Sequence, residues 1–307
     1  MNGFILSTVL AFASVSHAGF MPYQTREEAF KAVPVCAGAV TMDATRVARV
    51  GDLGQIAITG LGQTEAFDLP MTRDAVDMKI QGQTLYVLTT GTIQEWSMTE
   101  RKMILEMPTI NTDIRLQHGE EATGMDWHGT SLVISHGGMG YSIYDTVNHK
   151  ITDHVLVLRD QFPMESRLTS VVVVGDQAIF SVDSWTLSMP DQKGAFIGFL
   201  VMDLKTGKEI HRSPGPDVGN EMMVLAGDQL IVGYGMIPLH AFKLSDVLNG
   251  KRAMIQKIVM TYPVHGHPIG RAFYADNKLM TCFRQSGTEG QPSHTMPMVI
   301  EGSQFKR

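Results

Sequence analysis

Ten residues have side chains suited to binding or proton transfer, and they stand in or beside the segments that join the apolar runs of this chain. They are His118, Glu120, Glu121, His136, Asp183, Trp185, Glu221, His265, His267 and Arg271. Imidazole and carboxylate groups bind divalent metals and serve as general acids or bases. If the fold brings these segments to one surface, that surface is the candidate binding face.

His265 and His267, separated by one glycine, allow two interpretations. Residues two apart in an extended segment point to the same side, so both imidazoles can bind one metal ion. Glu121 or Glu221 would then complete the coordination shell. The alternative is that the two rings make only local hydrogen bonds, which is all that a chance H-x-H spacing requires. No cofactor is predicted from these residues, and a divalent metal is the alternative that this histidine pair leaves open.

The sequence contains no G-x-S-x-G, C-x-x-C or Walker motif. The glycine cluster Gly137-Gly138-Met139-Gly140 suits a tight turn better than a phosphate-binding loop. These observations favour a protein that binds a partner without catalysis. The alternative is a metal-dependent hydrolase or lactonase that uses the same histidines and glutamates.

A repeated pattern indicates which elements position these residues. Five times, an apolar stretch, a tight polar turn and a second apolar stretch follow one another, and the turns begin at Gly82, Gly129, Gly175, Gly227 and Asp276. These positions are 47, 46, 52 and 49 residues apart. Short strands repeated at this period predict a β-propeller.

Each repeat resolves into four strands, here named a to d. Four residues before the turn stand Met78, Met125, Val171, Met223 and Ala272, and two before it stand Ile80, Trp127, Val173, Leu225 and Tyr274. This alternation predicts strand a, with one face always buried. Strands b, c and d follow, so loops d–a and b–c emerge at one end of the ring. The ten residues above belong to that end, whose loops are long.

The two ends of the chain complete the ring in this interpretation. Residues 46–51, 55–60 and 64–70 read as strands b, c and d of a degenerate first repeat. The last repeat lacks a clear strand d, and residues 37–43 are predicted to supply it, which would close the ring across the termini. The fold class is therefore all-β, a single propeller of about six blades, with five or seven as alternatives.

The third repeat joins strands c and d through Met202-Asp-Leu-Lys-Thr-Gly-Lys208. This hairpin, and the Gly-Asp-Gln-Leu turn that begins at Gly227, resemble the repeats of bacterial YVTN-type and quinoprotein-type propellers. The resemblance covers scattered short stretches of residues 70–305. It implies an exported propeller architecture and carries over no catalytic residue; it also allows a redox or quinone-cofactor role, for which no signature is present.

The N-terminal 36 residues precede the ring. Residues 1–19 have the apolar core and small residues of a secretory signal, although Met1-Asn2-Gly3 lacks the usual basic residue; the alternative is a buried strand. Residues 20–36 form an extension with a short helix expected within 22–34. Residues 37–307 form the propeller. The signal predicts a periplasmic or secreted protein with no membrane span once it is removed.

The chain has two cysteines, Cys36 and Cys282. In a closed ring the first strand and the last repeat are neighbours, so an exported protein could join these residues by a disulfide. Two unpaired, buried thiols are the alternative.

Composition limits the partners. The net charge is −6, and 44% of residues are hydrophobic, so the sequence offers no electrostatic argument for nucleic acid or an anionic membrane. The expected function is that of an exported scaffold which binds a protein or a cell-envelope component through its d–a/b–c face.

Overall fold

The structure is a computed structural model. It describes residues 23–32, 36, 38–51, 54–62, 67–69, 75–110, 121–138, 140–156, 166–184, 198–214, 222–233, 239–252, 254–260, 266–285 and 294–304. The predicted signal segment lies outside these residues. Within the described part of the chain, no helix has both the length and the apolar character needed to cross a membrane.

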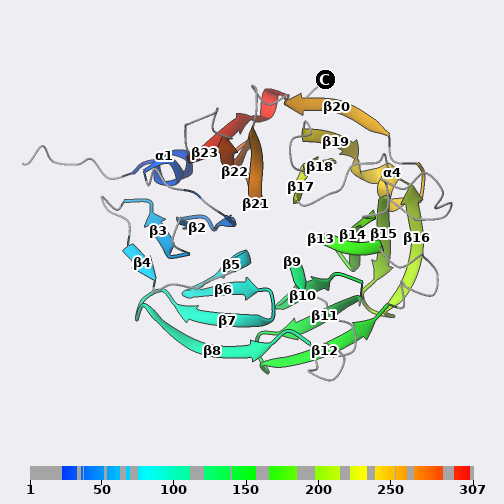
Figure 1. Ribbon diagram of the computed structural model, residues 1–307, viewed down its shortest axis with the longest axis horizontal. Coiled ribbons are helices and arrows are strands. Elements are labelled where there is room, and N and C mark those ends of the chain that lie inside the picture. Colours follow the sequence, from blue (N-terminus) through cyan, green and yellow to red (C-terminus); the bar gives the residue numbers. More distant parts are fainter. Residues whose placement is uncertain are drawn as a thin grey trace, which may run out of the picture.

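Six antiparallel sheets surround a common centre, which confirms a propeller of six blades (Figure 1). The first sheet contains β1 (Val40–Met42), β2 (Arg46–Val50), β3 (Ile56–Gly60) and β4 (Phe67–Leu69). The second contains β5 (Ala75–Gln81), β6 (Thr84–Thr89), β7 (Thr92–Ser97) and β8 (Lys102–Pro108). The third contains β9 (Ala122–His128), β10 (Ser131–His136), β11 (Gly140–Asp145) and β12 (Lys150–Val155).

The remaining sheets follow the same order. The fourth contains β13 (Ser166–Val174), β14 (Gln177–Ser184), β15 (Gly198–Asp203) and β16 (Lys208–Pro214). The fifth contains β17 (Met222–Ala226), β18 (Gln229–Gly233), β19 (Leu239–Lys243) and β20 (Ile255–Met260), and the helix α4 (Leu244–Leu248) lies between β19 and β20 in the chain. The sixth contains three described strands, β21 (Gly266–Ala275), β22 (Lys278–Gln285) and β23 (His294–Glu301), followed by the 3₁₀ turn η2 (Gly302–Gln304).

The recurring glycine of the sequence has a backbone reason. Gly82, Gly129, Gly175 and Gly227 have φ between 57° and 67°, each as the first of two residues that join strand a to strand b. A residue with a β-carbon resists this conformation, and two-residue hairpins require it. At the fifth turn Asp276 and Asn277 both adopt positive φ instead, as in a type I′ turn.

The hydrophobic core is divided among the contacts between neighbouring sheets. Met78 and Leu85 of the second sheet, for example, pack against Ile56 and Ile58 of the first. Similar clusters lie between each of the remaining pairs of neighbouring sheets, and the last cluster joins the sixth sheet to the first. Because each sheet is buried on both sides, its second strand is apolar almost throughout.

The predicted strand exchange at the ring closure is wrong. Residues 40–42 form β1, the innermost strand of the first sheet, and pair with β2. The reason is local: the carboxylate of Asp43 accepts hydrogen bonds from the backbone nitrogens of Thr45 and Arg46, at 2.7 and 2.6 Å, and so folds a hairpin. A strand held by such a short turn pairs with its sequence neighbour at little entropic cost.

Helix α1 (Arg26–Lys31) and a disulfide close the ring instead. The helix is the one expected within residues 22–34, and Thr25 and Glu28 form a capping box at its start. Arg26 and Glu27 pair with Asp276 and Lys278 of the sixth sheet. On the other side Thr59 of the first sheet donates to the Ala29 carbonyl at 2.9 Å. The helix therefore bridges the first and last sheets.

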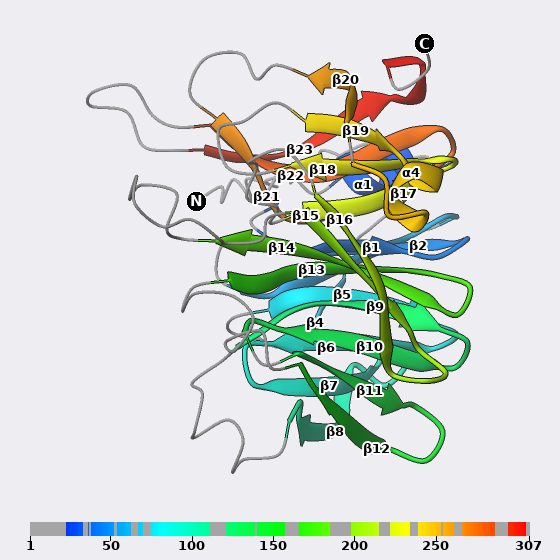
Figure 2. The same cartoon turned by 90° about the vertical axis from the view of Figure 1, so that its right-hand side faces the viewer.

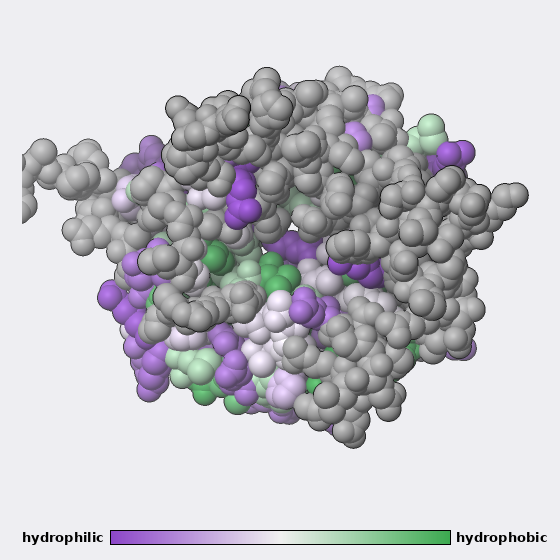
Figure 3. Space-filling view, in the orientation of Figure 1, coloured by the Kyte–Doolittle hydropathy of each residue, from purple (hydrophilic) through white to green (hydrophobic). Residues whose placement is uncertain are grey.

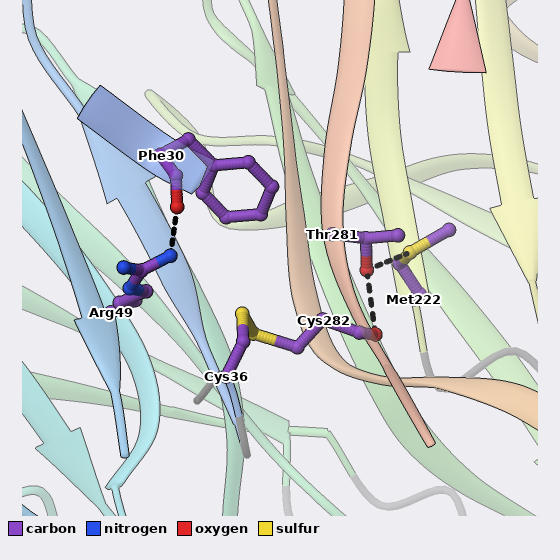
Figure 4. The surroundings of a disulfide bond; sticks show 6 residues. All are labelled: Phe30, Cys36, Arg49, Met222, Thr281 and Cys282. Carbon is purple, nitrogen blue, oxygen red and sulfur yellow. Dashed lines mark hydrogen bonds between the residues drawn. A yellow bond between two sulfur atoms is a disulfide. The ribbon is translucent and has the colours of Figure 1, made fainter. Parts of the chain in front are cut away.

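Cys36 and Cys282 form the predicted disulfide beside this helix (Figure 4). Their Cα atoms are 5.1 Å apart, and both residues are fully buried. Nearby Arg49, which is 1% exposed, donates to the Phe30 carbonyl at the end of α1, and its guanidinium lies 5.5 Å from the Phe30 ring centre. Burial lowers the pKa of Arg49 to about 10, with Tyr23 acting in the opposite direction.

Candidate binding site at the channel mouth

The innermost strands bring residues from several sheets to a cavity at one end of the central channel. Because all of these strands run in the same direction, β5, β9 and β13 begin at the d–a/b–c end of the ring. Figure 3 shows the molecule hollowed near its centre, with both hydrophilic and hydrophobic residues around the opening. The mouth cavity has a volume of about 370 Å³ and is lined by Gly38, Ala75, Val76, Thr90, Glu121, Ala122, Thr123, Arg167, Thr169 and Arg271.

Arg271 forms the floor of this cavity. It belongs to β21 of the sixth sheet and is 7% exposed. Its guanidinium donates from Nη2 to the Thr169 carbonyl at 2.8 Å and from Nη1 to the Ser170 hydroxyl, both in the fourth sheet. Its Nε lies 3.7 Å from a carboxylate oxygen of Asp77 in the second sheet. The side chain therefore spans the channel and links three sheets.

A glycine makes this crossing possible. A β-carbon placed on Gly124 of β9 would lie 2.4 Å from Nη2 of Arg271, which is closer than any real contact. The third sheet thus leaves room for the guanidinium rather than contacting it with a side chain. Any larger residue at position 124 would displace the arginine.

Beyond Arg271 lies a second cavity of about 160 Å³, lined by charged and apolar residues of the innermost strands. Lys79 and Asp126 form an ion pair there, with Nζ and Oδ1 3.3 Å apart. Burial acts to lower the pKa of Lys79, but the carboxylates of Asp126 and Asp77 outweigh it and raise that pKa. Arg271 lines both cavities and so separates the mouth from the inner channel.

The two aspartates also bind the backbone of neighbouring sheets. Asp77 accepts a hydrogen bond from the Met125 nitrogen at 2.9 Å, and Asp126 accepts one from the Val173 nitrogen at 2.8 Å. The innermost strand of a blade has an unpaired edge, and buried N–H groups there need acceptors. Carboxylates from the preceding sheet supply them, and charge-assisted bonds of this kind are strong.

The structure brings together two of the ten residues singled out in the sequence. Glu121, which is exposed, and Arg271 both line the mouth cavity. His136 instead lies inside the third sheet, 1% exposed, with Nε2 2.8 Å from the Ser142 hydroxyl. Its side chain is therefore buried, and a role in binding stays a prediction.

The other predicted residues are described only in part or not at all. Asp183 lies in β14 and His267 in β21. His118, Glu120, Trp185, Glu221 and His265 lie outside the described residues. Among the residues that the structure describes, no group of three or more His, Cys, Asp or Glu side chains is placed to hold a metal ion. The metal site at His265 and His267 stays a prediction.

Four charged residues of the channel were missed by sequence reasoning: Asp77, Lys79, Asp126 and Arg167. A signal for three of them existed. Asp77 and Lys79 flank the buried Met78, and Asp126 stands between Met125 and Trp127. In an innermost strand, the side chains of charged residues that alternate with core residues point to the channel or to the adjacent sheet.

Comparisons with known proteins support the architecture. No family model matches this chain, and no curated protein matches it. Among solved structures, U3-55K aligns with a TM-score of 0.55 at 10% identity, over 87% of this chain and 82% of that one. The computationally designed Ika8 protein aligns with a TM-score of 0.51 at 10% identity, over 88% of this chain and 97% of that one. These likenesses show the β-propeller fold alone, and the narrower resemblance to YVTN-type and quinoprotein-type repeats stays a prediction.

Proposed function

We propose that this protein is an exported β-propeller scaffold that binds a protein or cell-envelope partner over the mouth of its central channel. The observation that carries the proposal is the mouth cavity, which is built on strands of several sheets and closed below by Arg271. A rigid ring that presents a hollow at the end from which its long loops emerge is the usual layout of a binding scaffold.

The chemistry of the mouth suits a polar group that projects from the partner. The lining contains the guanidinium groups of Arg167 and Arg271, the carboxylate of Glu121 and the hydroxyl groups of Thr90, Thr123 and Thr169. Of these, Arg271, Thr123 and Thr169 already form hydrogen bonds within the ring. Arginine recognises planar carboxylates and phosphates with paired hydrogen bonds. A side chain or envelope group that enters the mouth would thus meet both charge signs, which favours recognition of shape and polarity over simple charge attraction.

The disulfide supports the exported location. Bonds of this kind persist in oxidising compartments and are rare in the cytosol. Cys36 stands beyond the predicted signal segment, so the bond would survive removal of that segment.

Site-directed photocrosslinking in the cells that produce the protein tests this proposal. A photoreactive residue is placed at Glu121 on the mouth, or at Thr130 in the turn between β9 and β10 at the opposite end, and both positions are exposed. We expect one discrete crosslinked partner from position 121 and no crosslink to that partner from position 130.

A substitution that fills the cavity tests whether the partner binds there. The substitution Thr123→Trp, placed in the crosslinking variant, should fill the mouth and abolish the crosslink without altering the circular dichroism spectrum. Equal crosslinking from both ends, or a crosslink that survives the filled mouth, would refute binding at this site.

A further inference from the structure

The c–d hairpins of four consecutive sheets form a second surface at the end opposite the mouth. We define the c–d rim as residues 99–104, 145–150, 203–210 and 243–254, which connect or begin the outer strands β8, β12, β16 and β20. Figure 2 shows the β11–β12 hairpin, the β15–β16 hairpin and α4 on the same side of the ring. The rim therefore follows the outer strands of four neighbouring sheets (Figure 1) at the end of the ring opposite the mouth (Figure 2).

The rim is basic, although the whole chain is acidic. Its segments contain eight basic and five acidic residues, against a net charge of −6 for the chain. The basic side chains belong to Arg101, Lys102, Lys150, Lys205, Lys208, Lys243, Lys251 and Arg252, all of which are exposed. The rim segments therefore have a surplus of three positive charges, although the a–b turns at the same end add the exposed Asp176 and Asp228.

Several of the acidic residues are engaged within their own turns. Asp145 accepts hydrogen bonds from the backbone nitrogens of Val147 and Asn148, at 2.9 and 3.1 Å. Asp203 does the same for Lys205 and Thr206, at 2.8 and 2.9 Å. The side-chain amide of Asn148, which donates to Asp145 at 2.7 Å, together with these backbone bonds keeps the pKa of Asp145 below its ordinary value. The backbone bonds from Thr206 and Lys205 lower the pKa of Asp203.

Three lysines of the rim also form ion pairs: Lys205 with Asp176 at 2.6 Å, Lys102 with Glu100 at 2.7 Å and Lys251 with Asp246 at 3.8 Å. The rest of the exposed positive charge is supplied by Arg101, Lys150, Lys208, Lys243 and Arg252.

Exposed apolar side chains accompany these charges. Seven large hydrophobic residues are exposed among those that the structure describes, and five of them belong to the rim. They are Val147 (67% exposed), Met254 (64%), Ile104 (55%), Met103 (42%) and Ile210 (41%). Single exposed hydrophobic residues are normal on any surface, but here five of them accompany lysines and arginines at one end of the ring, a combination that suits an interaction surface.

We infer that the c–d rim binds the surface of an anionic lipid bilayer. Nucleic acid would use the positive charge but would gain nothing from Val147 or Met254. A bilayer interface uses both, because acidic headgroups attract lysine and arginine while apolar side chains enter the boundary of the acyl region. The hairpins lie at one end of the ring, as contact with a flat surface requires. The channel mouth would face away from the bilayer.

This inference does not depend on the binding function proposed for the mouth. It is tested by sedimentation of the whole protein with vesicles of phosphatidylcholine alone, or of phosphatidylcholine with a minority of phosphatidylglycerol. We expect binding to the anionic vesicles only, and binding that weakens as salt is added.

Charge reversals with a matched control locate the surface. Each lysine or arginine near an anionic bilayer contributes about a fivefold gain in affinity, so Lys150→Glu or Arg252→Glu should weaken vesicle binding by about 30-fold. Arg284→Glu makes the same charge change at the exposed, mouth-side end of β22 and should change binding by less than about twofold. Val147→Ser combined with Met254→Ser should also weaken binding, including at a salt concentration where the charge effect is screened.

Three results would overturn the inference. The first is equal binding to neutral and anionic vesicles, and the second is an equal loss with Arg284→Glu. The third is binding to a soluble anionic polymer such as heparin, with the same dependence on Lys150 and Arg252, in a protein that does not sediment with vesicles. Inorganic phosphate at matched ionic strength should not compete, which separates a bilayer surface from a simple phosphate site.

Discussion

Arg271 shows how one residue joins elements that are far apart in the sequence. It contacts Thr169 and Ser170 in the fourth sheet and pairs with the buried Asp77 in the second. A charge that is taken out of water in this way is tolerated only when its partners remain. The residue therefore holds the ring together as well as forming the floor of the mouth.

Replacement of Arg271 by methionine should lower the free energy of unfolding by about 3–5 kcal/mol, because the buried Asp77 loses its arginine partner. Chemical denaturation measures the loss. Asp77→Asn in the Arg271→Met background should cost less than it does in the native protein, since it then removes an unpaired carboxylate and leaves no unpaired arginine behind. Additive effects of the two substitutions would show that the pair is not coupled.

His154 provides a pH-dependent contribution to stability. Its ring stacks on Tyr141, with centroids 4.6 Å apart and an interplanar angle of 2°. Burial lowers its pKa, while Asp153 acts in the opposite direction. A lowered imidazole pKa means that the folded state prefers the neutral ring. The contribution of His154 to the free energy of unfolding is therefore complete above pH 6.5, the ordinary pKa, and is lost as the pH falls through the pKa of the folded state.

The substitution His154→Phe should therefore reduce the loss of stability between neutral pH and about pH 5, while the stacking on Tyr141 is kept. Melting temperatures at a series of pH values check this expectation. Lys150→Gln, an exposed change on the same strand, serves as the control and should leave the slope unchanged. If the melting temperature of the phenylalanine variant depends on pH as strongly as that of the native protein, His154 is not the source of this dependence.

At the scale of elements, the a–b turns explain why the repeat was visible at all. Each turn needs a residue with positive φ at one position, so glycine recurs there at the period of the blade. Lack of space does not explain the glycines at positions 82, 129, 175 and 227, since a β-carbon there would meet nothing within 4 Å. The cost of substitution comes from the backbone alone.

Gly129→Val should therefore destabilise the protein by roughly 1–2 kcal/mol through backbone strain, and Gly129→Asn by less, because asparagine tolerates the left-handed region. Thermal unfolding of the two variants measures the difference. Thr130→Val, at the second position of the same turn, is the control. A loss as large for asparagine as for valine would mean that the turn has another conformation.

Strand β1, which sequence reasoning placed in the wrong sheet, is also positioned by a turn. Alternation and glycine spacing predicted the strands of five repeats, because these signals are local. The pairing of residues 40–42 depended on the small Asp43 turn, which gave no repeat signal and was not recognised. The second alternating column was also less buried than expected, since Trp127 is only partly covered and packs edge-on against Tyr86, with ring centres 5.4 Å apart.

At the scale of the whole molecule, features that depend on position around the ring could not be derived from the chain. The net charge gave no reason to expect a surface for anionic lipids, because it sums residues that the fold separates onto different ends. Arg271 was singled out, but its partners Asp77 and Thr169 stand 194 and 102 residues away, and no spacing rule connects them. The disulfide was the exception, since closure of any propeller brings its two ends together.

That closure leads to the final prediction. Cys36 and Cys282 are 246 residues apart, and in the chain-entropy model a bond across such a loop stabilises the folded state by about 5 kcal/mol. Cys36→Ala and the double variant with Cys282→Ala should therefore lower the melting temperature to a similar degree, since either change removes the whole bond. Both sulfurs are fully buried, so a dithiol reductant should reduce the bond slowly in the native protein and readily in denaturant. Titration of the denatured, unreduced protein should find no free thiol, and two free thiols would show that α1 and its ion pairs close the ring without the bond.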